Sequence, residues 1–228
     1  MRLSLILPLY NECGNIRRNF MKIYDAVQEI GDSEIILAED GSTDCTKRYV
    51  RRFSKLSGVR VTTSRVRLGR GGALKKAISM ARGRTIGYMD IDLAVPARYV
   101  WPALERVEHG SKIVAGSRYV KGAASMRSVK RFVASMGYNA LMRLLFNSKV
   151  RDHQCGFKFW NGHFIKGVLP EIRDNHWFFD SEVIVRARGK GIGTVEIPVE
   201  WKEQRSTKVK KTDVLYFVES IMRLRFGR

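Results

Sequence analysis

Short apolar runs alternate with longer amphipathic segments through the first half of the chain. Leu3–Leu7 is a continuous apolar run that ends at Pro8, a second apolar run occupies residues 34–38, and residues 59–63 predict a third strand. Such runs are typical of strands buried on both faces of a sheet. Between them, apolar residues recur every three or four positions, as at Ile16, Phe20, Ile23, Val27 and Ile30. This spacing predicts amphipathic helices between the strands.

The alternation continues with a predicted helix over residues 73–81 and a fourth strand that ends at Asp90. Strands that alternate with helices predict an α/β fold with a mostly parallel sheet flanked by helices. Ligands on such sheets bind at the edge formed by the carboxyl ends of the strands. Polar and acidic residues follow three of these strands: Tyr10, Asn11 and Glu12, then Glu39 and Asp40, then Asp90 and Asp92. We therefore expect a binding site at this edge.

Asp90 and Asp92 close the strand in the stretch TIGYMDIDLAVP. In an extended chain, residues two apart point to the same side, so both carboxylates can face one ligand. Hard cations such as Mg²⁺ and Mn²⁺ bind carboxylate and phosphate oxygens, which predicts a metal shared with a nucleoside diphosphate. The alternative is a merely polar strand end, because a motif this short recurs by accident.

A glycine-rich loop, residues 67–72, opens the predicted third helix and reads RLGRGG. It lacks the Gly-Lys-Ser/Thr ending of a P-loop, and the first strand is not followed by the Gly-x-Gly-x-x-Gly turn of a dinucleotide site. Amide groups at a helix start together with Arg70 can nevertheless hold an anion. A flexible surface turn is the alternative interpretation.

Charge sets this chain apart from an average globular protein. Its 42 Lys and Arg residues exceed its 22 Asp and Glu residues, which gives a net charge of +20. Such a field attracts polyanions: nucleic acid, an anionic membrane surface or a phosphorylated substrate. The three cysteines, Cys13, Cys45 and Cys155, are expected to be free thiols because their number is odd and their spacing is wide.

Two amphipathic segments in the second half combine an apolar stripe with basic flanks. The first stripe comprises Val129, Phe132, Val133, Met136, Ala140, Leu141, Leu144 and Leu145. The second comprises Val214, Phe217, Val218, Ile221 and Met222, and it follows a basic cluster of Lys202, Arg205, Lys208, Lys210 and Lys211. Helices that pack on the core are one interpretation. We favour helices that lie in the headgroup layer of an anionic membrane.

The motifs LPLYNE, AEDGSTD, LGRGGALKKA and MDIDLAVP, in this order, resemble the signatures of family 2 glycosyltransferases of the GT-A fold. AGSRYVKG, DHQCGFKFW, WFFDSEV and EIPVEW further resemble the dolichyl-phosphate mannose and glucose synthases, over residues 3–208. The resemblance implies an inverting transfer of a hexose from a nucleotide sugar to a polyprenyl or dolichyl phosphate, with Mg²⁺ or Mn²⁺ as cofactor.

The resemblance also implies roles for individual residues. The nucleotide-sugar site would comprise Pro8, Tyr10, Glu12, Glu39, Asp40, Arg70, Asp90, Ile91 and Lys208. Asp92 would bind the metal together with Asp90, and Arg118 and Arg131 would bind the acceptor phosphate. Asp152 would act as a base only if the acceptor were a hydroxyl. Glu39 stands where an aspartate is commoner, and Ala94 together with QCGFK favours UDP-glucose as the donor over GDP-mannose.

These features predict a glycosyltransferase domain over residues 1–208 and a basic amphipathic helix over residues 209–228. No apolar run approaches the ~20 residues that a membrane-spanning helix needs, so we expect a peripheral protein on the cytoplasmic face of a membrane. The sequence makes no prediction about oligomeric state. Three alternatives stay open: a family 2 enzyme that acts on a sugar hydroxyl, a catalytically weak scaffold, and a nucleic-acid-binding protein. The basic residues flank apolar stripes and do not interleave with exposed aromatic residues, which disfavours nucleic acid.

Overall fold

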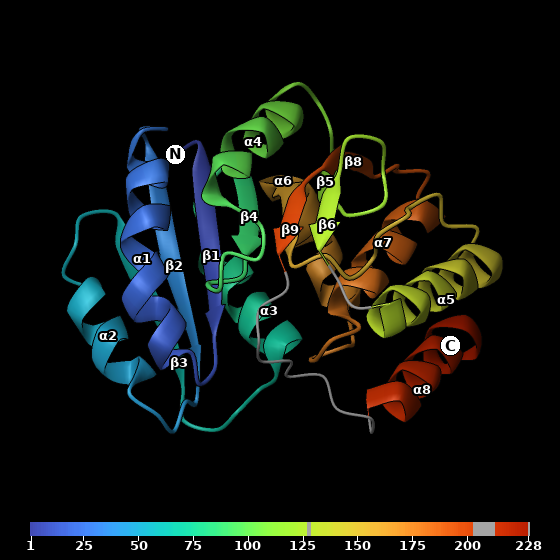
Figure 1. Cartoon of the computed structure of the whole chain (residues 1–228), viewed down its shortest axis with the longest axis horizontal. Helices are drawn as coiled ribbons and strands as arrows, with labels where there is room; N and C mark the ends of the chain where they lie inside the picture. Colours follow the sequence, from blue (N-terminus) through green and yellow to red (C-terminus); the bar gives the residue numbers. More distant parts are fainter. Residues whose placement is uncertain (127–128, 203–212, 228) are drawn as a thin grey trace.

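A seven-stranded sheet forms the centre of the computed structural model, which describes residues 1–126, 129–202 and 213–227 (Figure 1). The strand order is β3-β2-β1-β4-β7-β5-β8. The strands are β1 (Leu3–Leu9), β2 (Ser33–Asp40), β3 (Val59–Ser64), β4 (Thr85–Met89), β5 (Ile113–Ser117), β7 (Phe157–Asn161) and β8 (Val195–Pro198). Only β7 runs antiparallel to its neighbours β4 and β5, so the mostly parallel sheet predicted from the sequence is confirmed.

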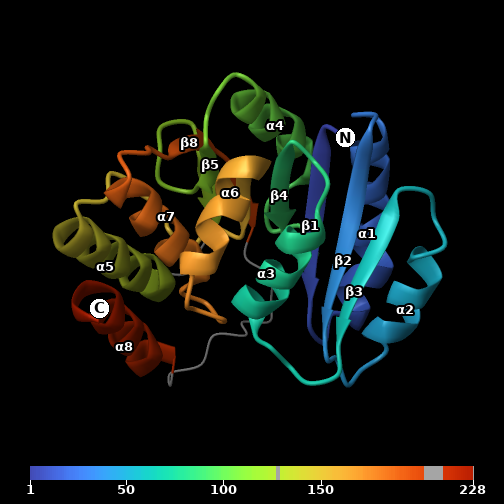
Figure 2. The ribbon, with the colours of Figure 1, turned by 180° about the vertical axis from the view of Figure 1, so that it is seen from behind.

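Helices cover both faces of this sheet. One face carries α1 (Cys13–Gln28), α2 (Thr46–Phe53), the 3-10 turn η1 (Ala97–Tyr99) and α4 (Val100–Glu108) (Figure 1). The other carries α3 (Arg70–Met80), α6 (Gly162–Val168), the 3-10 turn η2 (Leu169–Glu171) and α7 (Phe179–Gly189) (Figure 2). Each layer of helices buries its own apolar cluster against the sheet. This two-sided burial explains why the strands read as continuous apolar runs.

The remaining elements lie beyond the β5–β8 side of the sheet. A small second sheet pairs β6 (Ala124–Met126) with β9 (Glu200–Lys202). Helices α5 (Val129–Phe146) and α8 (Asp213–Phe226) lie side by side at that end of the molecule (Figures 1 and 2). Met142, Phe178 and Ile221 form a small apolar cluster there. Among the described helices, none has the length and hydropathy to span a membrane. The predicted boundary at residue 208 lies outside the described residues.

The expectation of three free cysteines is wrong. Cys13 and Cys45 form a disulfide with a Cα–Cα distance of 5.2 Å, and only Cys155 is a free, buried thiol. The loops after β1 and β2 run side by side, since the amide of Asn11 donates to Ser42 Oγ over 3.1 Å. Spacing along the chain cannot reveal this proximity, because it arises from the parallel pairing of β1 with β2.

Candidate functional site

A cleft of about 170 Å³ opens at the carboxyl ends of β1, β2 and β4. In the sheet, β2 lies beside β1 on one side and β4 lies beside it on the other. The cleft therefore lies at β1, the position where the order of the strands changes direction. Its walls are Pro8, Leu9, Tyr10, Glu12, Asn15, Asp40, Arg67, Arg70, Ala73, Asp90, Ile91, Asp92, His176 and Trp177. Most of the residues that the sequence assigned to a nucleotide sugar therefore come together in one place.

Two loops that follow β1 and β2 build one wall of the cleft. Asn11 adopts a left-handed conformation with φ of 51°, and its side-chain oxygen accepts a hydrogen bond from the amide of Thr43 over 2.8 Å. Both carboxylate oxygens of Asp40 accept from the backbone, over 2.6 Å from Leu68 and 2.9 Å from Gly69. Asp40 thus holds the glycine-rich loop against the cleft.

Arg70 occupies the floor of the cleft at the start of α3. Its guanidinium lies 2.8 Å from Asp90 Oδ1, 5.2 Å from the ring centre of Tyr88 and 5.4 Å from that of Trp177. The charge of Asp90 offsets the effect of burial and raises the pKa of Arg70. A permanently charged, oriented guanidinium beside a carboxylate is suited to a diphosphate bound with a cation.

Gly156 makes room for this ion pair. A Cβ atom at position 156 would lie 2.0 Å from Asp90 Oδ2 and 3.0 Å from a terminal nitrogen of Arg70. The backbone carbonyl of Gly156 also accepts from the amide of Asp90 over 3.2 Å. The loop that carries Gly156 therefore fixes where the carboxylate of Asp90 points.

Asp92 is half-buried, like Asp90, and is suited to bind a cation. The turn after β4, with Leu93 at φ of 55°, lets Asp92 Oδ1 accept from the amide of Ala94 over 2.9 Å. Burial and the neighbouring charge of Asp90 raise the pKa of Asp92 to about 6. The negative charges of two neighbouring carboxylates repel each other, and a divalent cation bound between them stabilises the ionised form of both.

The protein supplies few ligands to such a cation. Across the residues that the structure describes, no group of three or more His, Cys, Asp or Glu side chains is arranged to hold a metal. Asp90 is already paired with Arg70, which leaves Asp92 as the better placed ligand. This donor set fits Mg²⁺ or Mn²⁺ bound jointly with phosphate oxygens, because these ions keep several non-protein ligands.

Glu39 is placed differently from the other residues assigned to the nucleotide sugar. It is buried behind the wall of the cleft, and its Oε1 accepts from the amide of Ser42 over 2.5 Å. Its Oε2 is buried without a hydrogen-bond partner among the described residues. Lys208 lies outside the described residues, so its assignment stays a prediction.

Six residues that line the cleft had no role assigned from the sequence: Leu9, Asn15, Arg67, Ala73, His176 and Trp177. Arg67 stacks over Tyr10 with 3.9 Å between the guanidinium carbon and the ring centre. His176 and Trp177 come from the loop before α7, more than eighty positions after Asp90. The motif WFFDSEV marked that loop, but no local pattern could indicate that it closes the cleft.

Arg118 and Asp152 form a buried ion pair beyond β5. Nε of Arg118 lies 2.7 Å from Asp152 Oδ2, a terminal nitrogen lies 2.7 Å from Oδ1, and the amide of Arg118 donates to Oδ2 over 3.0 Å. Burial alone would raise the pKa of Asp152, but the charge of Arg118 holds it below its usual range. Asp152 is fully buried with both oxygens engaged, which favours anchoring of Arg118 over proton transfer. Arg131 lies in the first turn of α5, and its side chain is outside the described part of the chain.

The two helices with apolar stripes leave several large apolar side chains exposed. On α5, Phe132, Val133, Leu141 and Leu144 are 46%, 62%, 37% and 81% exposed. On α8, Leu215, Val218, Met222 and Phe226 are 76%, 51%, 51% and 68% exposed. The interpretation of the α5 stripe as part of the core therefore fails for these four residues, although Leu145 of the stripe packs against the cluster that contains Met142.

Comparison with known proteins places this site in a family. A family model described as Glycosyl transferase family 2 matches residues 4–164. The glycosyltransferase AglD of Haloferax volcanii is 38% identical over 98% of this chain, and the chain spans 37% of that protein. The dolichyl-phosphate beta-glucosyltransferase of Saccharomyces cerevisiae is 28% identical over 91% of this chain, which spans 69% of that protein.

Solved structures support the same fold. Glucosyl-3-phosphoglycerate synthase from Mycobacterium tuberculosis, in complex with Mn²⁺, UDP and glucosyl-3-phosphoglycerate, superposes with a TM-score of 0.72. The sequences are 16% identical, and the alignment covers 98% of this chain and 78% of the other. At this identity the similarity establishes the shared architecture, which is the GT-A fold expected from the sequence.

Proposed function

Since the chain belongs to glycosyl transferase family 2, we propose that it is a metal-dependent inverting enzyme that transfers glucose from UDP-glucose to a polyprenyl phosphate at an anionic membrane surface. The cleft that joins Asp90 and Asp92 with Arg70 carries this proposal. It combines a cation site with a fixed positive charge, which is what a nucleoside diphosphate leaving group requires. GDP-mannose is the second candidate donor.

The names of relatives support the acceptor and the sugar. Several are called dolichyl-phosphate beta-glucosyltransferase, among them those of Saccharomyces cerevisiae and Homo sapiens. Solved neighbours with bound UDP and Mn²⁺ agree with a uridine nucleotide held with a divalent cation. Alanine at position 94, where mannose-transferring relatives often have glutamine, points the same way.

The proposed reaction needs no strong base. A phosphate monoester is mostly dianionic at neutral pH, so its oxygen can attack the anomeric carbon directly. The new carbon–oxygen bond forms as the bond to the β-phosphate of UDP breaks, and UDP leaves with the negative charge. Arg70 stabilises that charge, and a bound Mg²⁺ or Mn²⁺ would act as a Lewis acid on the same phosphate oxygens. The burial of Asp152 disfavours the alternative hydroxyl acceptor, which would need a base.

Arg118 and Arg131 would position the acceptor phosphate. Asp152 engages Nε and one terminal nitrogen of Arg118, so contact with a phosphate would fall to its other terminal nitrogen. Arg131 lies in the first turn of α5, on which the apolar side chains Val133 and Leu144 are exposed, so it would lie near the lipid headgroups. The exposed apolar residues of α5 and α8, together with the charge of +20, support a peripheral membrane association.

The test measures transfer and hydrolysis with the same donor. Wild-type protein, Arg131→Ala and Arg131→Lys are incubated with UDP-glucose or GDP-mannose, Mn²⁺ or chelator, and a polyprenyl phosphate in anionic vesicles. We expect transfer of glucose from UDP-glucose in the presence of Mn²⁺, and we expect the chelator to abolish this transfer. Arg131→Ala should lower transfer about thirtyfold or more while hydrolysis changes little, and Arg131→Lys should fall between. Equal loss of both rates in Arg131→Ala would contradict the acceptor assignment, and faster transfer from GDP-mannose would contradict the donor assignment.

A further inference from the structure

The loop of residues 173–177, before α7, forms one wall of the donor cleft. His176 and Trp177 line the cleft, and the Trp177 ring faces the guanidinium of Arg70 at 5.4 Å. Tyr88 faces the same guanidinium at 5.2 Å. Arg70 therefore depends on this loop for part of its orientation, and a displaced loop would leave it less well fixed.

The loop is packed tightly onto the glycine-rich start of α3. The amide of Gly72 donates to the carbonyl of Asn175 over 2.9 Å. A Cβ atom at Gly69 would lie 2.2 Å from His176 Nδ1, and one at Gly71 would lie 2.8 Å from the backbone of Asn175. The glycines of this segment thus allow the loop to touch the helix start, so a displacement of the loop would disturb this contact.

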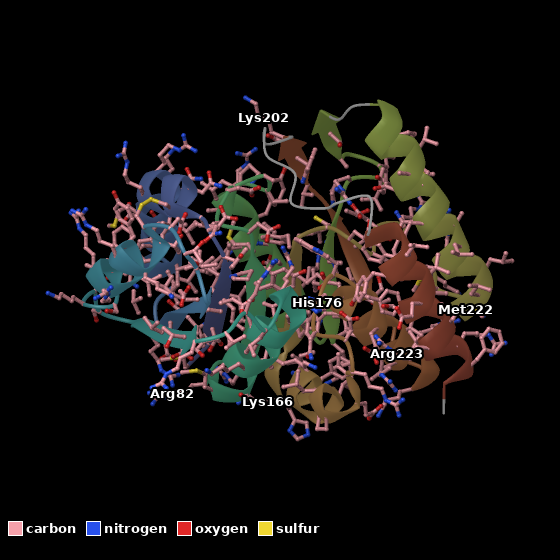
Figure 3. All side chains as sticks on the ribbon, turned by 90° about the horizontal axis from the view of Figure 1, so that it is seen from below. Arg82, Lys166, His176, Lys202, Met222 and Arg223 are labelled. Atoms are coloured by element: carbon pink, nitrogen blue, oxygen red, sulfur yellow. A yellow bond between two sulfur atoms is a disulfide. The ribbon has the colours of Figure 1, made fainter. Side chains whose placement is uncertain are left out.

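Asp174 connects this loop to helix α8. Its side chain is 1% exposed, and Oδ1 accepts from the amide of His176 over 2.7 Å. Its Oδ2 accepts from the hydroxyl of Tyr216 and lies 3.2 Å from a terminal nitrogen of Arg223, both on α8. The rings of His176 and Tyr216 also meet edge to face at 5.7 Å. Figure 3 views the molecule from this side, with His176 near the middle and Met222 of α8 toward the edge.

Helix α8 is held to the body by a small contact. Its fully buried apolar anchor is Ile221, in the cluster with Met142 and Phe178, and Tyr216, Phe217 and Leu224 pack against that cluster while partly buried. Leu215 and Phe226 are 76% and 68% exposed. Because much of the apolar surface of α8 stays exposed, polar links contribute to its attachment beside this apolar contact. The bonds from Tyr216 and Arg223 to Asp174 are such links, and they end on the loop that carries the cleft residues His176 and Trp177.

We propose that Asp174 is a positioning residue that joins α8 to the donor cleft, so that the seating of α8 sets how firmly the cleft holds a nucleoside diphosphate. The path runs from α8 through Asp174 and the loop to Trp177 and Arg70. Membrane contact by the exposed face of α8 would then strengthen donor binding. This link has a function only if the cleft binds a nucleoside diphosphate, so the inference rests on the function proposed above.

The test uses the full chain and measures the affinity for UDP with Mn²⁺ by titration calorimetry. Tyr216→Phe removes one hydrogen bond to Asp174 and leaves the cleft residues intact, and Asp174→Ala removes the whole link. We expect UDP binding about fivefold weaker in Tyr216→Phe and at least tenfold weaker in Asp174→Ala, within the usual range of coupling between sites. Anionic vesicles without acceptor lipid should tighten UDP binding to the wild type and much less to Tyr216→Phe.

Two matched controls separate positioning from general loss of stability. Tyr24→Phe removes a tyrosine hydroxyl that donates to the carbonyl of Ser57 over 3.1 Å, away from the cleft. Glu34→Gln alters a carboxylate that is 1% exposed and bonded to Ser4 and Arg60 near the start of β2. Both controls should keep wild-type affinity for UDP. Hydrogen exchange at the amide of Gly72 should accelerate in Tyr216→Phe and stay unchanged in Tyr24→Phe.

The outcomes distinguish a failure of the role of Asp174 from a failure of the donor site. Wild-type affinity for UDP in Tyr216→Phe and in folded Asp174→Ala, with unchanged exchange at Gly72, overturns the role of Asp174 and leaves the donor site standing. Equal weakening in the controls also overturns it, because the effect would then be general destabilisation. A wild-type protein that binds neither UDP nor GDP with Mn²⁺ overturns the donor site itself, and the inference with it.

Discussion

The sequences of helices α1 and α5 are both amphipathic, but the two helices differ in how much of their apolar stripe they bury. On α1, Ile16, Phe20, Ile23 and Val27 are completely buried against the sheet. On α5, polar Ser135 and Asn139 are buried, whereas apolar Val133 and Leu144 are 62% and 81% exposed. The first helix buries its apolar face, as is usual for a protein in water, whereas α5 buries Met142 and leaves much of its apolar stripe exposed.

This difference distinguishes two parts of the molecule. The donor half contains the cleft at the carboxyl ends of β1, β2 and β4, and the surface half consists of helices α5 and α8. The donor half buries its apolar residues and presents charged groups in a cleft. The surface half, α5 and α8, leaves large apolar side chains outside, although burying each would contribute about 1.5–3 kcal/mol. Several such residues on adjacent helices indicate an apolar partner, and the positive net charge favours an anionic membrane.

The largest effect is expected from Asp92→Ala in the donor half. Removal of this carboxylate takes away the better placed cation ligand, so transfer should fall at least about a thousandfold. Binding of UDP should also lose its dependence on Mn²⁺, while association with anionic vesicles stays unchanged. Radiolabel transfer and vesicle sedimentation measure the two properties separately.

Asp32→Ala serves as a control for Asp92→Ala. Asp32 is a carboxylate with 62% side-chain exposure that pairs with the terminal amine, away from the cleft. The variant should retain full transfer activity. Full activity in Asp92→Ala would contradict the metal assignment, and a loss of vesicle binding would show that the two halves are not separable.

Gly156→Ala should have the next largest effect. Its Cβ would meet Asp90 Oδ2 at 2.0 Å, so Asp90 would have to rotate away from Arg70. A displacement of about 1 Å near the reacting groups can lower a rate about a hundredfold. Gly167→Ala is the matched control, because nothing lies within 4 Å of its Cβ position on α6. A transfer rate of Gly156→Ala equal to that of Gly167→Ala would show that Asp90 does not need this orientation.

Local pattern predicted the donor half well. Apolar runs and helical spacing indicated β1 to β4, α1 and α3, and the acidic residues after β1, β2 and β4 indicated the edge with the cleft. These predictions succeed because burial of one face imposes a period on the sequence. The resemblance to a known family then supplied roles that no periodicity could give, such as those of Arg118 and Asp152.

Contacts between distant segments could not be predicted. The Cys13–Cys45 disulfide depends on how two loops lie side by side, and Trp177 reaches Arg70 only because α7 packs beside α3. The stripe on α5 was visible, but the residues that face inward, Ser135 and Asn139, follow from polar contacts such as that of Asn139 with the amide of His153. Sequence pattern indicates that a helix is amphipathic and leaves open which medium its apolar face meets.

The third prediction concerns the pH dependence of stability in the absence of metal. The pKa of Asp92 is raised from 3.8 to about 6, so the folded state retains a proton that the unfolded state releases. Stability therefore falls as pH rises from about 4 to about 6 and stays lower above that range. Asp92→Asn removes this decline and should raise the free energy of unfolding by about 3 kcal/mol at pH 8.

Denaturant unfolding at pH 4 and pH 8 checks this expectation. The side-chain oxygen that Asp92→Asn retains can still accept from the amide of Ala94, so the turn should persist in this variant. The two proteins should be nearly equal in stability at pH 4 and should differ at pH 8. A difference of the same size at both pH values would mean that charge on Asp92 is not its cause.

The smallest effect, Leu144→Ala, tests the surface half directly. Leu144 is 81% exposed, so its truncation should change the free energy of unfolding by less than about 0.5 kcal/mol. If α5 lies in the headgroup layer, the loss of methylene groups should weaken partitioning into anionic vesicles about tenfold. Ile23→Ala is the opposite case: this residue is 0% exposed on α1, so the change should lower stability by about 2–5 kcal/mol and leave vesicle affinity unchanged in the folded protein. Vesicle binding that is the same in Leu144→Ala and wild type, across a series of salt concentrations, would mean that α5 does not meet lipid and that its exposed apolar face serves another partner.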